Sequence, residues 1–155
     1  MSFTNYDHVN EQYQYIVDCF GYWNQFTDIS TPTYHINQPL AQVLGHNVVG
    51  TSTVMVKASV FETVGLFNTG MSYCEDWQLW LKICENFEVA VLTKSYTGYL
   101  MRSDSITQTD SNRLQHLSVF ESVSYTLITL PHTVHDYIHF VPLSSQTHTF
   151  IHRSY

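Results

Sequence analysis

The alternation of apolar and polar residues predicts several short strands in this chain. The clearest is Val48–Val56, where valines alternate with small polar residues and β-branched side chains predominate. Glu88–Leu92 is a shorter apolar run, and Tyr96–Met101 follows it with a strand-forming composition. Within the polar and aromatic residues 1–35, Tyr13–Val17 could form a strand by its β-propensity.

Helical spacing and end signals predict helices between these strands. Residues 37–44 read as a short helix with Pro39 in its first turn. A capping box begins at Ser59 and Gly65 follows as a stop signal, which predicts one or two helical turns.

A second capping box, from Ser72 to Glu75, predicts a helix that runs to about Asn86. One face of this helix carries apolar residues at helical spacing, namely Trp77, Trp80, Leu81 and Cys84. The same spacing recurs in Leu114, Leu117, Phe120 and Val123, which predicts a last helix from about Thr109 to Tyr125.

This succession of strands and helices is an α/β pattern. The chain has 155 residues, enough for one domain with a buried core. We expect residues 1–123 to form a partial domain and residues 124–155 to be a His/Thr-rich tail. The tail holds five of the nine histidines: His132, His135, His139, His148 and His152.

Charge and composition exclude several classes of partner. There are 6 basic and 13 acidic residues, a net charge of -7, and the basic residues form no run. We therefore expect no binding to nucleic acid. The chain has no apolar run of membrane-spanning length and no basic, apolar leader at its start. Its three cysteines form no CxxC pair, so we expect a protein of the reducing cytoplasm without a transmembrane segment.

The densest chemical signal lies in residues 47–107. A turn Val64-Gly65-Leu66-Phe67-Asn68 precedes Glu75-Asp76-Trp77-Gln78-Leu79-Trp80, and Tyr99-Leu100-Met101-Arg102-Ser103-Asp104-Ser105-Ile106-Thr107 closes the run. Over roughly residues 36–113, this order resembles the C-terminal, acceptor-side half of inverting family 2 glycosyltransferases. The resemblance implies a partial nucleotide-diphospho-sugar transferase-like sheet with flanking helices, whose N-terminal nucleotide-binding half is missing.

By this resemblance, Asp76 is the general base of a sugar transfer. Inverting transfer needs a carboxylate that takes the proton from the acceptor hydroxyl, and the first turn of a helix favours an ionised side chain. The alternative is an acid that only complements the helix dipole. Glu75 is a second catalytic candidate, although its spacing from Ser72 favours a capping role.

Three further residues are candidates for substrate binding. Trp77 could form an apolar wall for a sugar ring or pack in the core, whereas core packing is the preferred interpretation of Trp80. Arg102 could pair with a donor diphosphate, and Ser105 matches the same closing motif. Leu100 stands where the family usually has an arginine, and the alternative for Arg102 is an ordinary surface position.

The chain contains no Asp-x-Asp motif and no glycine-rich phosphate loop. We therefore expect no metal or cofactor bound by this chain alone, and Mn or Mg only with a complete donor site. The expected partners are a sugar acceptor and either a separate donor-binding half or a second copy of the chain.

Three functions follow for the folded chain. The first is a glycosyltransferase-like protein, incomplete alone, that transfers a sugar to an acceptor hydroxyl with Asp76 as the base. The second is a non-catalytic or truncated remnant that serves as a scaffold, and the third is a small sugar-binding module. An exposed strand edge at the missing half would favour a split or truncated enzyme. Coverage of that edge by residues 1–35 would favour the binding module.

Overall fold

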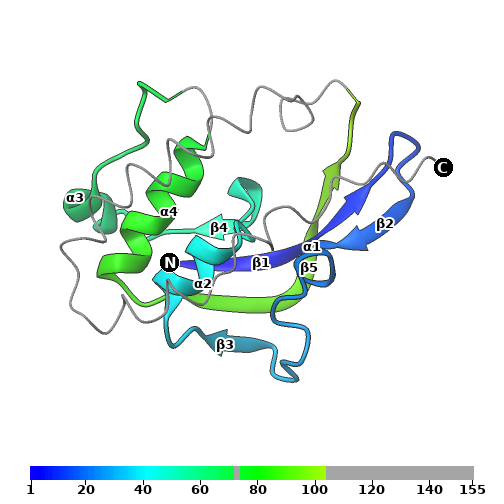
Figure 1. Ribbon diagram of the computed structural model, residues 1–155, viewed down its shortest axis with the longest axis horizontal. Helices are drawn as coiled ribbons and strands as arrows, with labels where there is room; N and C mark the ends of the chain where they lie inside the picture. Colours follow the sequence, from blue (N-terminus) through cyan, green and yellow to red (C-terminus); the bar gives the residue numbers. More distant parts are fainter. Residues whose placement is uncertain (72–73, 104–155) are drawn as a thin grey trace.

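The computed structural model describes residues 1–71 and 74–103, which form a curled, mixed five-stranded sheet with four short helices (Figure 1). The strands are β1 (Ser2–Val9), β2 (Tyr15–Asp18), β3 (Thr33–His35), β4 (Val54–Met55) and β5 (Ala90–Leu100). The helices are α1 (Cys19–Trp23), α2 (Pro39–Gly45), α3 (Val60–Val64) and α4 (Glu75–Asn86), and a 3-10 turn, η1, spans Thr51–Thr53. The α/β class predicted from the sequence is confirmed.

Strand β1 lies at the centre of the sheet. It runs parallel to β5, and β3 pairs antiparallel with the first residues of β5. The other edge of β1 is shared by β4, which pairs at Ser2 and Phe3, and by β2, which pairs from Asp7 to Val9. Residues 1–35 therefore supply three of the five strands, on both sides of the central pair.

The sequence pattern did not predict β1, because most of its residues are polar. Phe3 is fully buried, and Asn5 is a buried polar residue whose amide is fully engaged. Its Nδ2 donates to Asp18 at 2.7 Å, and its Oδ1 accepts from the backbone N–H groups of Tyr6 and Phe20. A buried amide is tolerated because every polar atom finds a partner, and this one joins β1 to the start of α1.

The strand predicted at Val48–Val56 is wrong over most of its length. Only Val54 and Met55 pair in the sheet. Val48 and Val49 are both buried, which strict alternation would not allow. The chain turns at Gly50, where an added Cβ would stand 2.9 Å from the Tyr6 ring, so a larger residue would force that ring to move.

The two strands predicted at Glu88–Leu92 and Tyr96–Met101 are one strand, β5. The polar residues between them, Thr93 to Ser95, do not end the strand. The register with β1 shifts there instead, so extra residues of β5 are accommodated as bulges. The predicted strand at Tyr13–Val17 is confirmed in part by β2, which begins at Tyr15.

The helices predicted over residues 37–44, after Ser59 and up to about Asn86 are confirmed as α2, α3 and α4, but the capping box at Ser59 is wrong. The Ser59 side chain makes no capping hydrogen bond, although Gly65 ends α3 at a positive φ of 78°, as predicted. Helix α4 begins after Cys74, which has a left-handed backbone and no side-chain cap. Ser72, the helix predicted over residues 109–125 and the tail 124–155 lie outside the described residues.

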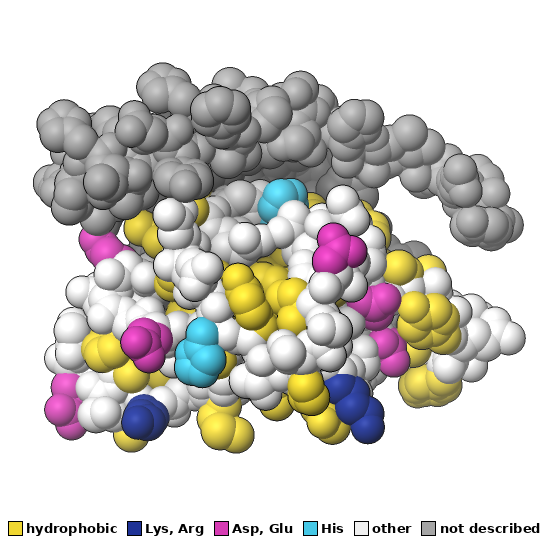
Figure 2. All heavy atoms as spheres, turned by 90° about the horizontal axis from the view of Figure 1, so that it is seen from below, with side chains coloured by type: hydrophobic (Ala, Val, Ile, Leu, Met, Phe, Trp, Pro, Cys, Tyr) yellow, Lys and Arg dark blue, Asp and Glu magenta, His cyan; other side chains and the backbone are white. Residues whose placement is uncertain are grey.

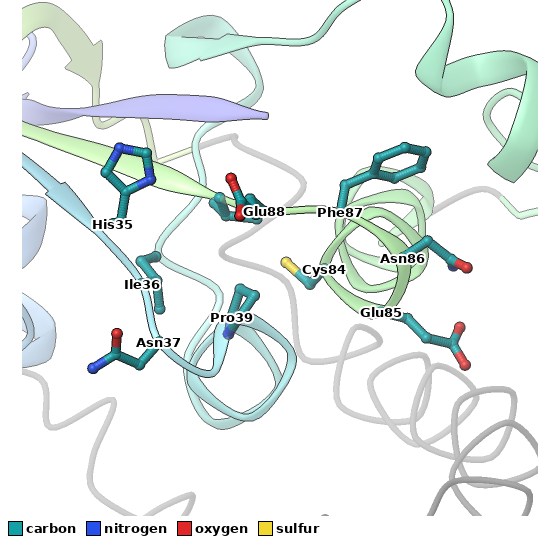
Figure 3. A pocket seen from close by; sticks show the side chains of 10 residues that line it. His35, Ile36, Asn37, Pro39, Cys84, Glu85, Asn86, Phe87 and Glu88 are labelled. Atoms are coloured by element: carbon teal, nitrogen blue, oxygen red, sulfur yellow. The ribbon is translucent and has the colours of Figure 1, made fainter.

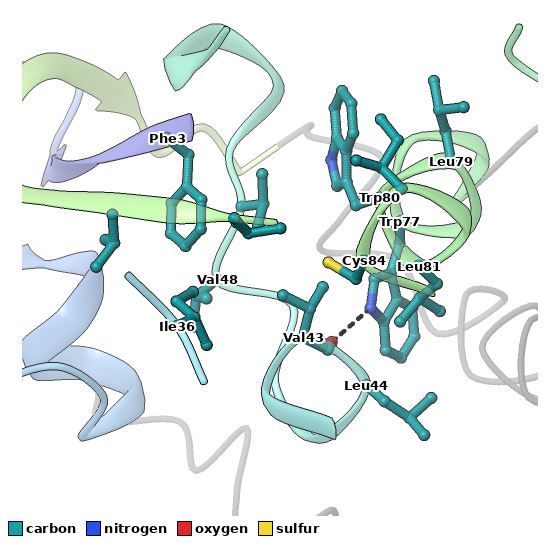
Figure 4. Packing of buried hydrophobic residues seen from close by; sticks show 14 of the residues in the cluster. Phe3, Ile36, Val43, Leu44, Val48, Trp77, Leu79, Trp80, Leu81 and Cys84 are labelled. Carbon is teal, nitrogen blue, oxygen red and sulfur yellow. Dashed lines mark hydrogen bonds between the residues drawn. The ribbon is translucent and has the colours of Figure 1, made fainter. Parts of the chain in front are cut away.

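Helix α4 packs against α2 and α3, and its buried residues share one core cluster with Phe3 and Val91 of the sheet (Figure 4). Trp80 is 2% exposed, which confirms its core role, and Trp77 is 4% exposed. The indole N–H of Trp77 donates to the carbonyl of Val43 at 2.8 Å. That carbonyl lies in the last turn of α2, where carbonyls lack partners within the helix, so Trp77 satisfies a helix end.

The two tryptophans of α4 differ in the partner of their indole N–H, which allows a matched test. Within residues 1–71 and 74–103, the Nε1 of Trp80 is buried without a hydrogen-bond partner. We expect Trp77→Phe to lower the free energy of unfolding by about 1–3 kcal/mol more than Trp80→Phe, because only the former leaves a buried carbonyl unsatisfied. Urea unfolding of both variants measures this difference. Equal losses would mean that the Val43 bond contributes nothing.

In the described part of the chain, none of the helices is long and apolar enough to cross a membrane.

Candidate functional site

Asp76 lies in the first turn of α4, and two groups orient its carboxylate. Its Oδ2 accepts a hydrogen bond of 2.8 Å from the Thr51 hydroxyl, and its Oδ1 accepts one of 2.7 Å from the backbone N–H of Trp77. The side chain is half-exposed. A carboxylate offers about four lone-pair positions, so acceptor capacity remains on the accessible side of the group.

Thr51 is a site residue that the sequence pattern missed, because it was assigned to the interior of a strand. The turn η1 follows Gly50, which lies close to the Tyr6 ring. The Thr53 N–H and hydroxyl both bond to the Gly50 carbonyl at 2.8 Å, which closes the turn. The turn therefore holds Thr51 at the N-terminal end of α4.

Glu75 is the first residue of α4, where it shares the helix start with Asp76, and its predicted capping partner Ser72 lies outside the described residues. Its catalytic role stays a prediction, since it lies next to the candidate base but makes no described side-chain contact that would orient it.

The structure describes two of the three predicted substrate-binding residues, Trp77 and Arg102. Trp77 is buried in the core cluster, so the core interpretation of its ring is favoured over a sugar-facing wall. Arg102 lies two residues after β5 with an exposed side chain, and its pairing with a diphosphate stays a prediction. Ser105 lies outside the described residues.

A continuous set of rings crosses the sheet beside the Asp76 carboxylate. We call this set the aromatic row, and its members are Tyr6, His8, Tyr22, Trp23, His46 and Tyr99. Successive ring centroids are 5.1–5.7 Å apart from Tyr99 through His8, Tyr22 and Trp23 to His46, and the Tyr6 centroid lies 6.0 Å from that of Tyr99. Strands β1 and β5, helix α1 and the residue after α2, His46, supply these rings, so only the tertiary fold brings them together.

His8 is held in one tautomer by its backbone partner. Its Nδ1 lies 3.2 Å from the carbonyl oxygen of Val17, and a carbonyl can only accept. Nδ1 must therefore donate, which leaves Nε2 of the neutral ring as an acceptor. Burial lowers the pKa of His8, opposed by the Val17 carbonyl and by the charges of Asp18 and Asp7. The ring is neutral at physiological pH.

These shifts predict that stability falls as the pH drops below 6.5. Burial lowers the pKa of both His8 and His46. Just below pH 6.5, the unfolded chain therefore binds more protons at these two histidines than the folded chain does. The stability contributed by the two neutral histidines is fully present above pH 6.5, the pKa of histidine in the unfolded chain. It is lost as the pH falls below that value toward the lower pKa of each histidine in the folded chain. Thermal unfolding of the wild type and of the double variant His8→Asn, His46→Asn measures this. An identical pH dependence in both would contradict it.

The three cysteines of the chain are buried thiols. Burial raises the pKa of Cys19 to about 11 and those of Cys74 and Cys84 to about 12. The thiolate is the nucleophilic form of cysteine, so these side chains are inert at neutral pH.

A hollow of about 510 Å³ lies away from Asp76, between residues 35–39 and the C-terminal end of α4 (Figure 3). His35, Asn37 and Glu88 are among the polar residues that line it. Asp76 belongs to the opposite end of the same helix, so this hollow is not part of the carboxylate site.

No group of three or more metal-ligating side chains comes together in residues 1–71 and 74–103. On the face that Figure 2 shows, the Lys and Arg side chains lie apart from one another among acidic and apolar side chains. This face therefore offers no basic patch to a phosphate backbone.

No protein-family model, no curated protein and no solved structure matches this chain. The likeness to family 2 glycosyltransferases therefore rests on the run of motifs in residues 47–107.

Proposed function

We propose that this chain is the acceptor-side part of a glycosyl-transfer system, with the sheet of a partial nucleotide-diphospho-sugar transferase. Asp76 takes the proton from an acceptor hydroxyl while the oxygen of that hydroxyl attacks the anomeric carbon of the donor. The nucleoside diphosphate leaves with the electron pair of the broken bond. The observation that carries this proposal is that Thr51 and the Trp77 N–H orient the Asp76 carboxylate. The carboxylate oxygens keep further lone pairs that can accept a proton.

A base must be held in position before the acceptor binds, because a misplaced carboxylate loses much of its effect on the rate. Thr51 and the first turn of α4 supply this positioning from two different segments. The proposed system also needs a donor site from outside the described residues, where a divalent Mn or Mg ion would balance the diphosphate charge.

The test adds the full chain to an extract of its source cells with radiolabelled nucleotide sugars, Mn²⁺ and cellotetraose as the acceptor. We expect wild-type chain to raise the transfer of label to the oligosaccharide and Asp76→Asn to leave it at the background rate. Equal stimulation by both proteins would remove Asp76 from the mechanism, and no stimulation by either would reject the transfer function.

A second candidate is a sugar-binding module without chemistry. The specific observation in its favour is that residues 1–35 supply β1 of the central pair and also β2 and β3, which flank that pair and complete the sheet. In this case the chain binds an oligosaccharide but does not stimulate transfer, and Asp76→Asn leaves the affinity nearly unchanged.

A further inference from the structure

The aromatic row presents its rings to solvent in a way that core packing does not require. Tyr22 is 52% exposed, Tyr99 is 38% exposed and Trp23 is 37% exposed. These rings come from α1 and β5, and the half-buried His8 lies between them at 5.7 Å from both Tyr22 and Tyr99. The row therefore combines exposed aromatic rings with one hydrogen-bond acceptor, the Nε2 of His8.

We propose that the aromatic row binds a neutral oligosaccharide, with sugar faces stacked on Tyr22, Trp23 and Tyr99 and a sugar hydroxyl donating to the Nε2 of His8. The C–H groups on the face of a pyranose are weakly positive, and the face of an aromatic ring is negative, so the two attract. This inference rests on the proposed function and names the class of its acceptor.

The charges around the row select a neutral ligand over an anionic one. The carboxylates of Asp7 and Asp18 act on His8, and that of Asp76 acts on Tyr6. Uronic acids, phosphorylated sugars and single-stranded nucleic acids would be repelled by these groups. A row of rings that stacks nucleic acid bases needs a positively charged groove beside it.

The row leads to Asp76 through Tyr6. The Tyr6 ring lies 6.0 Å from Tyr99 and 5.2 Å from His8, and it contacts the backbone at Gly50. Gly50 precedes Thr51, whose hydroxyl binds Asp76. Because the charge of Asp76 also acts on Tyr6, we expect the end of an oligosaccharide at Tyr6 to point toward the candidate base, as an acceptor requires.

The test titrates the full chain with cellotetraose, maltotetraose and chitotetraose and follows amide chemical shifts by NMR. We expect at least one of these neutral sugars to bind at millimolar concentration or below. Tyr22→Ala and Tyr99→Ala should each weaken that binding by about tenfold, the order of one aromatic contact. His8→Asn keeps a donor near the Val17 carbonyl and removes the Nε2 acceptor, so at a pH above 6.5 it should weaken binding while the chain stays folded, which thermal unfolding checks.

Tyr96→Ala is the matched control, because Tyr96 is 65% exposed on the same strand but its ring lies beneath the Lys94 ammonium. We expect it to bind as the wild type does. Three results would overturn the inference: no binding of any of the three sugars, equal effects of Tyr96→Ala and Tyr99→Ala, or tighter binding of an oligothymidylate or of a trigalacturonate. If Asp76→Asn abolished sugar transfer but the row variants did not, this inference would be rejected and the proposed function would stand. If the row variants weakened sugar binding but the chain stimulated no transfer, only the proposed function would be rejected.

Discussion

Replacement of Asp76 by asparagine is expected to lower sugar transfer by roughly 10²–10⁴-fold, the usual contribution of a general base. The amide has nearly the same shape, and its one oxygen can still accept a hydrogen bond, but it cannot take a proton from the acceptor. The free energy of unfolding should change by no more than about 1 kcal/mol, because the side chain is half-exposed and stays polar. Initial rates in the extract assay and urea unfolding of the purified variant measure the two effects.

Glu75→Gln is the matched control for this change, since it removes the same charge one residue earlier in α4. It should leave most of the activity. If Glu75→Gln abolished transfer and Asp76→Asn did not, the base would be Glu75. If Asp76→Asn unfolded the chain, the carboxylate would be structural and the catalytic assignment would fail.

Phe3→Ala is expected to destabilise the fold by about 3–5 kcal/mol, a large part of the stability of a small domain. Phe3 is fully buried in β1, and its ring packs edge-on against Phe20 and Phe26 at 6.1–6.2 Å. Truncation leaves a cavity between the central strand and α1. Urea unfolding followed by far-UV circular dichroism measures the loss.

Leu66→Ala serves as the control, because Leu66 is 72% exposed and its truncation should cost less than about 0.5 kcal/mol. Equal effects of the two substitutions would mean that β1 does not lie in the core. Strand β1 also contributes to the proposed sugar-binding site, because Tyr6 and His8 of the aromatic row belong to this strand. A variant that detaches β1 should therefore lose sugar binding together with stability.

The helices were predictable because their signals are local. Trp77, Trp80, Leu81 and Cys84 recur at a spacing that only a helix brings onto one face, and all four are buried in α4. The end of α3 at Gly65 was also predictable, since a positive φ favours glycine. The helix starts were less certain, because a capping motif specifies possible side-chain bonds that the chain need not make.

The sequence by itself determined the α/β class, the position of α4 and the place of Asp76 in its first turn. Only the tertiary structure decided that the polar strand β1 is central, that β5 continues through its bulges and that the chain turns at Gly50. It also brought Thr51 to Asp76 and assembled the aromatic row. The physical reason is that a strand gains its stability from partners distant in sequence, whereas a helix satisfies its backbone within a few residues.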